Sequence, residues 1–438
     1  MRLRRSLQGA EALLSALMLV AGPVGAQDGK EVDMARNTVV ILGGGVGGLV
    51  AANELRTRLG DRHRIVLVEK NRDFVFAPSL LWLMVGWRQP RQITKELSRL
   101  VHPGVELVQA EVREVDAAGG KVVTSTGTLE YDALVVALGA ALAPEAMPGY
   151  SEAAHNFFDL DGATGLVRAL KDFRGGRLLV AVSALPYKCP AAPYEAAFLL
   201  EDAFRRRGLR DRTQIEIFTP EPQPMPVAGP VLGQAVTGLM AQRGIVYHPN
   251  RPVASIDPER RELVFQDGAR EGFDLLAAVP PHRAPQAVRE SALANEAGWV
   301  PVDKHSLATR LENVYALGDV TAITLSNGRP LPKAGVFAHA EALAVARSLA
   351  AQLSGGHREE FDGAGFCWME LGGGESAFAA GDFYAEPNPV VDLKQPGRLM
   401  HWGKVLFESY WLGDGLIRTL SRLGLELGGR WLGMKVDL

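Results

Sequence analysis

Short apolar runs alternate with helical stretches near the beginning of the chain. Thr38–Leu42 is an apolar run of five residues, and a glycine-rich turn over 43–48 follows it directly. A helical stretch then extends through Leu59, and a second apolar run, Arg64–Val68, ends at Glu69. This order predicts a strand, a tight turn, a helix and a second strand, which is the first unit of a Rossmann-like α/β domain.

The glycines of this turn have the G-x-G-x-x-G spacing of a dinucleotide-binding turn. Gly43 permits the tight turn, Gly45 lets the backbone approach a pyrophosphate, and Gly48 lets the helix and strand pack closely. The helix N-terminus offers amide donors and the positive end of its dipole to the phosphates. Glu69 follows the last glycine by about twenty residues, the place of an acid that accepts hydrogen bonds from a ribose diol.

Two later segments resemble the FAD-binding strands of flavoproteins that carry two dinucleotide-binding domains. Tyr131–Gly139 is a buried apolar strand that ends in glycine, similar to the strand that returns to the FAD domain. Asn313–Asp319 resembles the second FAD motif. The resemblance implies that FAD is the cofactor, that Gly139 and Gly318 belong to its site, and that Asp319 binds the ribityl chain.

The same resemblance extends to positions on either side of these strands. Val112 matches the position whose backbone meets the adenine, although an ordinary strand valine is an equal alternative. Lys333 and Gly335 open a long alanine-rich helix that extends to about Leu353. The N-terminus of this helix would point at the flavin pyrimidine and stabilise negative charge on the reduced ring.

The middle third of the chain lacks a second glycine motif. Arg177–Val182 reads as a strand, and a helix is expected to end near Arg207. The turn between them contains prolines and Cys189 where a pyrophosphate would bind, with no G-x-G-x-x-G. The sequence therefore predicts an NAD-like domain that has lost its phosphate chemistry, which argues against NAD(P)H as the electron donor.

Composition narrows the candidate chemistry further. The chain has 438 residues, a net charge of −3 and two cysteines, Cys189 and Cys367, which lie 178 positions apart. Two cysteines exclude a disulfide-stapled scaffold and a metal or iron–sulfur site built on four cysteines, and we predict no metal. The net charge offers no basic field for nucleic acid. The cysteines are either two bystanders or one redox pair.

Around the cysteines, the chain resembles the sulfide:quinone oxidoreductases and the flavin subunit of flavocytochrome c sulfide dehydrogenase. The resemblance covers about 38–411 and is most specific in Lys188–Glu195 and Phe366–Trp368. It implies that Cys189 and Cys367 flank the flavin as a redox-active pair. Many members carry a third cysteine earlier in the chain, which is linked to persulfide handling or to covalent flavin; this sequence has none, so covalent FAD through that cysteine is excluded.

The implied chemistry is thiol–disulfide exchange. Sulfide attacks the disulfide, and the displaced thiolate delivers two electrons to the flavin. We expect Lys188, or the helix start after Pro190, to lower the pKa of the Cys189 thiol. In the resemblance Glu195 handles a proton near this cysteine, whereas a plain helix first-turn acid is the equal alternative.

The predicted fold class is α/β, with two Rossmann-like three-layer domains and a C-terminal amphipathic helical region. One domain binds FAD and the other is a degenerate NAD-like domain. The expected segments are 34–150 and 299–355 for the FAD domain, 151–298 for the NAD-like domain, and 356–438 for the C-terminal region.

Residues 1–33 allow two readings. Arg4, Arg5, the apolar run 12–21 and Val24–Ala26 resemble a secretory leader with a small-residue cleavage site. The alternative is an over-extended start, with translation beginning at Met34. The first reading predicts a periplasmic protein, and the second predicts a peripheral protein on the cytoplasmic face of the cell membrane.

The C-terminal region carries an amphipathic pattern. Residues 401–411 read as a helix with an aromatic face, and leucines then recur at helical spacing with arginines between them. The recurring leucines are Leu416, Leu420, Leu423 and Leu427. We expect this helix to lie on a membrane surface, while a core helix or a homo-oligomer contact stays an alternative. Lys404 and Phe407 match the spacing of a lysine and an aromatic at the quinone site of the resembled family, although surface and core roles explain them equally well.

The leading hypothesis is a flavoprotein that oxidises sulfide through Cys189, Cys367 and FAD and reduces a membrane quinone. The first alternative is a sulfide dehydrogenase that reduces cytochrome c. The others are a type II NADH:quinone dehydrogenase and a non-catalytic protein that binds flavin and sulfane sulfur.

Overall fold

The computed structural model describes residues 36–433, 436 and 437. The chain divides into two units, Met1–Arg36 and Asn37–Leu438, and the fold described below is that of the second. The predictions of a leader or an over-extended start concern residues 1–33 and lie outside the described residues.

A parallel sheet of five strands forms the centre of the first domain. Its strand order is β20-β9-β1-β2-β5. The strands are β1 (Thr38–Leu42), β2 (Arg64–Glu69), β5 (Glu106–Gln109), β9 (Ala133–Val136) and β20 (Val314–Ala316). The late strand β20 pairs with β9, so two distant segments of the chain complete one sheet. The central strand β1 ends at the glycine turn, where open α/β sheets bind their ligands.

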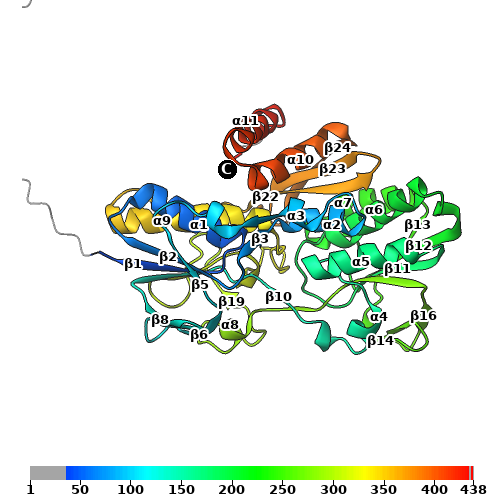
Figure 1. Ribbon diagram of the computed structural model, residues 1–438, viewed down its shortest axis with the longest axis horizontal. Helices are drawn as coiled ribbons and strands as arrows, with labels where there is room; N and C mark the ends of the chain where they lie inside the picture. The colour runs from blue at the N-terminus through cyan, green and yellow to red at the C-terminus, as the bar shows by residue number, and fades with distance from the viewer. Residues whose placement is uncertain (1–35, 434–435, 438) are drawn as a thin grey trace, which may run out of the picture. The chain divides into compact units, whose positions relative to one another are not determined.

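Both faces of this sheet are covered, as Figure 1 shows. Helices α1 (Val46–Leu59) and α9 (Gly335–Ser354) pack against each other on one face. On the other face lies an antiparallel sheet of β6 (Val112–Asp116), β7 (Lys121–Thr124) and β8 (Gly127–Glu130). Alternate residues of β1 enter the two cores, because strand side chains point to opposite faces in turn. The predicted three-layer FAD-type domain is confirmed.

A second parallel sheet, in the order β13-β12-β11-β17, forms the middle domain. Its strands are β11 (Gly176–Val182), β12 (Thr213–Phe218), β13 (Ile245–His248) and β17 (Leu275–Val279). The helices of this domain are α4 (Tyr150–Ala153), α5 (Leu160–Asp172), α6 (Ala192–Arg206) and α7 (Pro230–Gln242). A small sheet of β14 (Val253–Asp257), β15 (Glu262–Phe265) and β16 (Arg270–Gly272) belongs to the same part of the chain. The predicted segment boundaries stay predictions.

Short elements connect these parts. They are β3 (Asp73–Val75), β4 (Thr94–Glu96), β10 (Ala141–Leu142), β18 (His282–Arg283), β19 (Val300–Pro301), β21 (Thr321–Ala322), α2 (Leu80–Met84), α3 (Pro90–Ile93) and α8 (Gln286–Arg289). Strands β10 and β18 pair where the chain enters and leaves the middle domain. Helix α2 contacts α5 and α6 of that domain.

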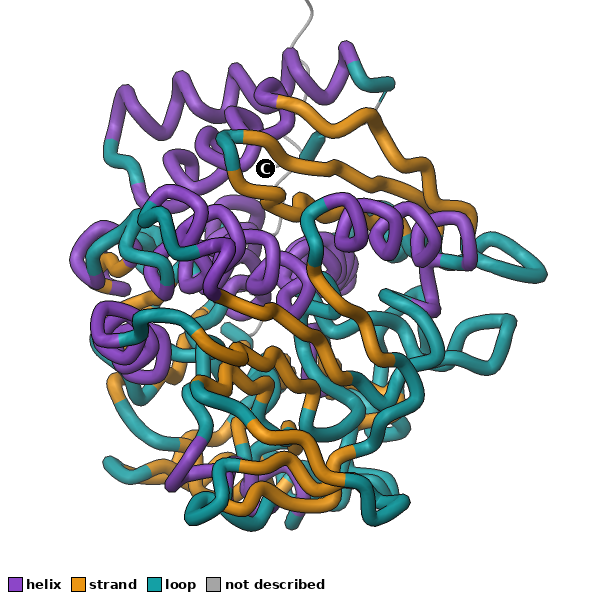
Figure 2. Tube along the Cα trace, turned by 90° about the vertical axis from the view of Figure 1, so that its right-hand side faces the viewer, coloured by secondary structure: helices purple, strands orange, loops and turns teal. Residues whose placement is uncertain are grey.

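The C-terminal region is an antiparallel sheet followed by two helices. The sheet consists of β22 (Ala364–Gly372), β23 (Glu375–Asp382) and β24 (Val390–Gly397), and the helices are α10 (Arg398–Leu412) and α11 (Gly415–Trp431). Strand β22 contacts α6 and α9, so it touches both domains, and α10 packs on β22 and β23. The orange sheet and red helices lie over the rest of the unit in Figure 1, and Figure 2 shows the same layer from the side. Within the described residues, no helix has the length and apolar character needed to span a bilayer.

Candidate active site

The glycine turn after β1 has the geometry of a dinucleotide cradle. A Cβ atom on Gly43, whose φ is +100°, would lie 2.4 Å from the Ala137 carbonyl oxygen. A Cβ on Gly48 would lie 1.8 Å from the Gly43 carbonyl oxygen, whereas a Cβ on Gly45 would meet no atom within 4 Å. The first and last glycines are therefore required by packing, and the middle one leaves open space beside the backbone.

Glu69 lies at the end of β2, where the sequence predicts a ribose-binding acid. Its Oε2 accepts a hydrogen bond from the Gly44 amide at 2.7 Å, and its Oε1 accepts one from the Asn71 amide at 2.8 Å. The carboxylate therefore holds the glycine turn in place. A carboxylate has about four lone-pair positions, so it retains acceptor capacity for a ribose hydroxyl.

Asp319 follows β20 and is half-buried beside the start of α9. The Gly318 amide donates to Glu341 Oε2 at 2.5 Å, and Gly318 has a φ of +74°. Asp319 Oδ1 is buried, and no partner for it lies among the described residues. Burial raises the pKa of Asp319, while the charges of Lys188 and Lys333 oppose the rise. An unsatisfied buried acceptor fits a hydroxyl donor such as those of a ribityl chain.

Lys333 lies next to this aspartate, but its ammonium is bound by the protein. Its Nζ donates to the Asp319 carbonyl at 2.7 Å and the Thr321 carbonyl at 2.9 Å, and lies 3.8 Å from the centre of the Trp299 ring. Burial lowers its pKa to about 8. The ammonium thus stabilises the loop around Asp319. A direct contact of Lys333 with a cofactor stays a prediction.

The other predicted cofactor positions lie around the same end of the sheet. Val112 is half-buried at the start of β6, Gly139 follows β9 with a φ of +67°, and Gly335 begins α9. Their roles stay predictions. The glycine cradle, the orphaned Asp319 oxygen and the start of α9 together fit FAD.

Cys189 lies in the turn between β11 and α6, where an NAD domain would bind phosphate. Its φ is +55°, and its amide donates to the Lys333 carbonyl at 2.7 Å. This bond joins the middle-domain turn to the residues just before α9. Tyr187 and Tyr194 donate to the buried carboxylate of Glu221 at 2.9 and 3.0 Å, and these bonds hold the two ends of the turn.

Cys367 lies on β22, and the packing of β22 on α6 brings it to the same region as Cys189. The two thiols are unbonded; Cys189 is half-buried and Cys367 is exposed. Although much of the residue is exposed, desolvation of the sulfur raises the pKa of Cys367, and the charge of Cys189 adds to that rise. The two cysteines therefore lie close enough to influence each other.

The expected lowering of the Cys189 pKa is wrong. Burial, followed by the negative charge of Glu195, raises the pKa of this thiol to about 12. The charge of Lys188 acts instead on Asp319 and His282, whose pKa values it lowers. The positive charge that favours the Cys189 thiolate comes instead from Lys404.

Glu195 and Lys404 form a buried ion pair beside the cysteines. Lys404 Nζ donates to Glu195 Oε1, and both side chains are almost fully buried. Burial raises the pKa of Glu195 to about 7, and Lys404 opposes that rise. Lys404 Nζ also lies 4.9 Å from the centre of the Trp82 ring. The sequence did not indicate this pairing, because 209 positions separate the two residues.

Phe407 lines an apolar pocket of about 300 Å³ between the C-terminal helices and the C-terminal sheet. Its ring centre lies 5.3 Å from that of Trp368 and 6.2 Å from that of Phe366. Lys404, predicted beside Phe407 at a quinone site, is not among the residues of this pocket and lies on the cysteine side. Their roles toward a quinone stay predictions.

Three comparisons relate the chain to known proteins. Residues 37–342 match the model of the family described as pyridine nucleotide-disulphide oxidoreductase. The mitochondrial sulfide:quinone oxidoreductase of Mus musculus is 25% identical over 428 residues, covering 89% of this chain and 90% of the mouse protein. The sulfide-quinone reductase of Aquifex aeolicus is 26% identical over 391 residues, covering 85% and 90%. The crystal structure of the sulfide:quinone oxidoreductase from that bacterium has a TM-score of 0.79 at 24% identity, covering 92% of this chain and 96% of the other.

Proposed function

The chain belongs to the pyridine nucleotide-disulphide oxidoreductase family, and within it we propose that the protein is an FAD-dependent sulfide:quinone oxidoreductase. Both sequence relatives above carry sulfide and quinone in their names and match over most of their length. The observation that supports the proposal is the buried Glu195–Lys404 ion pair, whose charges act on both Cys189 and Cys367.

In the oxidised protein the cysteines form a disulfide. H₂S enters the site and gives one proton to Glu195. The resulting hydrosulfide attacks one sulfur, the S–S bond breaks, and the products are a persulfide on one cysteine and a thiolate on the other. Bound FAD supplies the two-electron acceptor for this centre. Lys404 stabilises the thiolate, and Glu195, whose pKa is raised to about 7, is suited to hold the released proton near neutral pH.

The apolar pocket supports a quinone as the second substrate. Its walls are almost wholly apolar and aromatic, the character expected for a quinone ring and the start of its tail. It is bounded by Phe366, Trp368, Phe378, Met400, Leu406 and Phe407 from the sheet and α10, and by Leu425, Trp431 and Val436 toward the C-terminus. Phe407 lines this pocket and is the aromatic side chain that we expect to contact the quinone ring.

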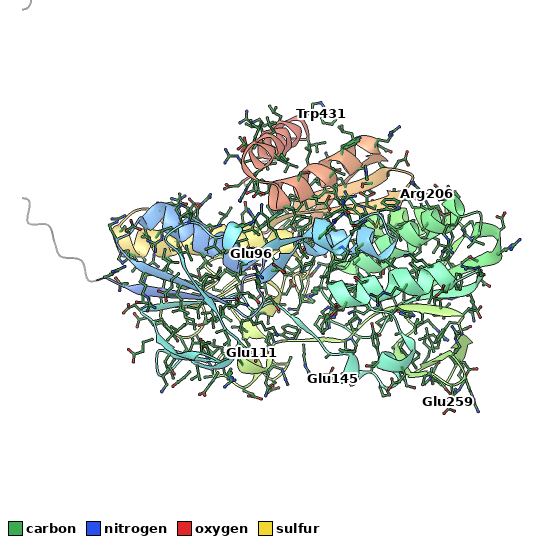
Figure 3. The ribbon with its side chains drawn as sticks, viewed as in Figure 1. Glu96, Glu111, Glu145, Arg206, Glu259 and Trp431 are labelled. Atoms are coloured by element: carbon green, nitrogen blue, oxygen red, sulfur yellow. The ribbon has the colours of Figure 1, made fainter. Side chains whose placement is uncertain are left out.

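The outer side of α11 supports contact with a membrane surface. Leu416, Leu420 and Leu427 expose more than half of their area, and Trp431 exposes 72%. Trp431 lies at the outermost edge of the unit in Figure 3. Exposed leucines beside Arg418 and Arg422 are typical of a helix that lies in a bilayer interface. The side of the membrane depends on which interpretation of residues 1–33 holds. A start at Met34 predicts the cytoplasmic face, and a leader predicts the periplasmic face. Contact with a second copy of the chain in a homo-oligomer stays an alternative role for these exposed leucines.

The acceptor is tested with the purified holoprotein and sulfide, supplied with either decylubiquinone or cytochrome c. We expect sulfide-dependent reduction of decylubiquinone and little direct reduction of cytochrome c. Rapid reduction of cytochrome c without quinone would instead support the sulfide dehydrogenase alternative. NADH serves as the control donor, and rapid quinone reduction by NADH would support a type II NADH dehydrogenase.

A further inference from the structure

Ionisable side chains continue from the cysteines toward the edge of α10. Glu195 on α6 pairs with Lys404 on α10, and His401 lies one helical turn before Lys404. Glu370 on β22 lies among these three groups. It is fully buried, and its charge acts on both Glu195 and Lys404. The proposed chemistry uses Glu195 and Lys404 and leaves Glu370 and His401 without a role.

Glu370 and His401 are in direct contact. His401 Nδ1 lies 2.9 Å from Glu370 Oε2 and 3.0 Å from its Oε1, and the Ser376 hydroxyl donates to Oε1 at 2.5 Å. The His401 side chain is 19% exposed, whereas that of Glu370 is 0% exposed. The imidazole therefore joins a buried carboxylate to the surface.

The surroundings hold this pair in place. The Trp82 ring of α2 packs edge-on against His401 with the ring centres 6.0 Å apart, and the Arg88 guanidinium lies over the Trp82 ring, 4.5 Å from its centre. Arg88 is itself paired with Glu408 at 2.8 Å. The charged groups that interact with the pair are thus Glu195 from α6 and Lys404 from α10. Arg88, from the segment after α2, and its partner Glu408 adjoin the Trp82 ring that packs on His401.

The proposed reaction requires a proton to leave this region. Oxidation of H₂S to sulfane sulfur releases two electrons and two protons. One proton accompanies the electron pair to the acceptor. The other proton has to leave the site, where the acid–base groups are buried. Burying an ionised carboxylate is costly unless it is paired, so a buried carboxylate that leads to a surface imidazole suits a path for that proton.

We propose that Glu370 and His401 form the outer half of a proton relay, which carries the proton released at the cysteines from Glu195 to solvent beside α10. The relay rests on the proposed function. Glu195 takes the proton from the reacting sulfur and passes it to Glu370, which passes it to His401, and His401 releases it to water. Lys404 keeps its own proton, and its charge holds both carboxylates beside it. Among the described residues no hydrogen bond joins the two carboxylates directly, so this transfer needs a side-chain rotation.

The test follows anaerobic reduction of bound FAD by sulfide in stopped flow, with phenol red as an independent reporter of proton release. In His401→Ala and Glu370→Gln we expect both signals to slow by about 10²-fold. Added imidazole restores His401→Ala by tenfold or more and leaves Glu370→Gln slow. His401→Asn keeps a donor toward Glu370 without carrying a proton, so it reports on the relay even if the alanine variant does not fold.

His248→Ala is the matched control. His248 Nε2 lies 2.7 Å from Glu216 Oε2, so it is a histidine–carboxylate pair of the same kind in the middle domain. We expect wild-type rates and no response to imidazole. The relay is overturned if His401→Ala and His401→Asn release protons at the wild-type rate, or if imidazole fails to restore an FAD-loaded alanine variant. Wild-type protein that sulfide does not reduce would instead overturn the proposed function.

Discussion

Replacing Lys404 with methionine tests the buried ion pair most sharply. The change keeps most of the side-chain volume but removes the cation beside Glu195, whose side chain is 3% exposed. Breaking a buried pair by removing one partner costs about 3–5 kcal/mol, because the other charge stays buried without compensation.

Protonation of Glu195 limits this loss and makes it depend on pH. An unpaired carboxylate can be neutralised, and protonating a group with an ordinary value of 4.5 costs about 5 kcal/mol at pH 8 and about 2 kcal/mol at pH 6. The wild-type carboxyl, with a pKa of about 7, already takes up a proton between pH 8 and pH 6. The loss of unfolding free energy in Lys404→Met is therefore expected to be about 1 kcal/mol smaller at pH 6 than at pH 8.

Urea unfolding of the holoprotein, followed by tryptophan fluorescence at both pH values, measures this difference. The control is Glu195→Gln combined with Lys404→Met, which removes both charges. We expect it to lie within about 1 kcal/mol of the wild type with no added pH dependence. The account of the pair is refuted if the single variant loses the same stability at both pH values, or if the double variant is as unstable as the single one.

Three further predictions concern the cofactor, the membrane and acid stability. Asp319→Ala removes the orphaned acceptor, so FAD should bind about tenfold more weakly or worse in a titration of apoprotein; unchanged binding would contradict the assignment. Leu420→Glu combined with Leu427→Glu should abolish co-sedimentation with lipid vesicles. The control Val231→Glu, at a residue 75% exposed on α7, should leave co-sedimentation intact. Loss in all variants, or in none, would contradict membrane contact through α11. Burial lowers the pKa of His339 to about 4, so the folded protein binds fewer protons than the unfolded chain below pH 6.5 and loses stability as the pH falls. His339→Gln should recover about 2 kcal/mol of the loss between pH 6.5 and 5 in urea unfolding, and an unchanged slope would speak against this role.

Local sequence patterns predicted the elements of the nucleotide fold well, because the strands, the helix and the glycine turn are determined mainly by residues that are close together in the chain. The first strand has the predicted bounds, Thr38–Leu42, and the first helix ends at Leu59 as expected. The apolar stretch 131–139 yields a shorter strand, β9, which covers Ala133–Val136, and the chain turns at Gly139 with a φ of +67°. Spacing also predicted the C-terminal leucine repeat, but only the packing of α11 shows that the stripe is exposed.

The electrostatics of the cysteine site could not be predicted from the sequence. Lys188 is the neighbour of Cys189 in the chain, but Lys404 is the cation that acts on the thiol. Contacts between α6, β22 and α10 bring Lys404 to Glu195, and no local pattern encodes them. Burial dominates the pKa of Cys189, and burial depends on the whole fold.

The central claim is that Cys189 and Cys367 pass electrons from sulfide to bound FAD. Anaerobic mixing with sulfide, followed at the flavin absorbance band, tests it in the wild type and in Cys189→Ser and Cys367→Ser variants with full FAD content. We predict rapid bleaching of the wild type by sulfide, little bleaching by NADH, and loss of the sulfide reaction in each variant. Bleaching of both variants at the wild-type rate would contradict the account.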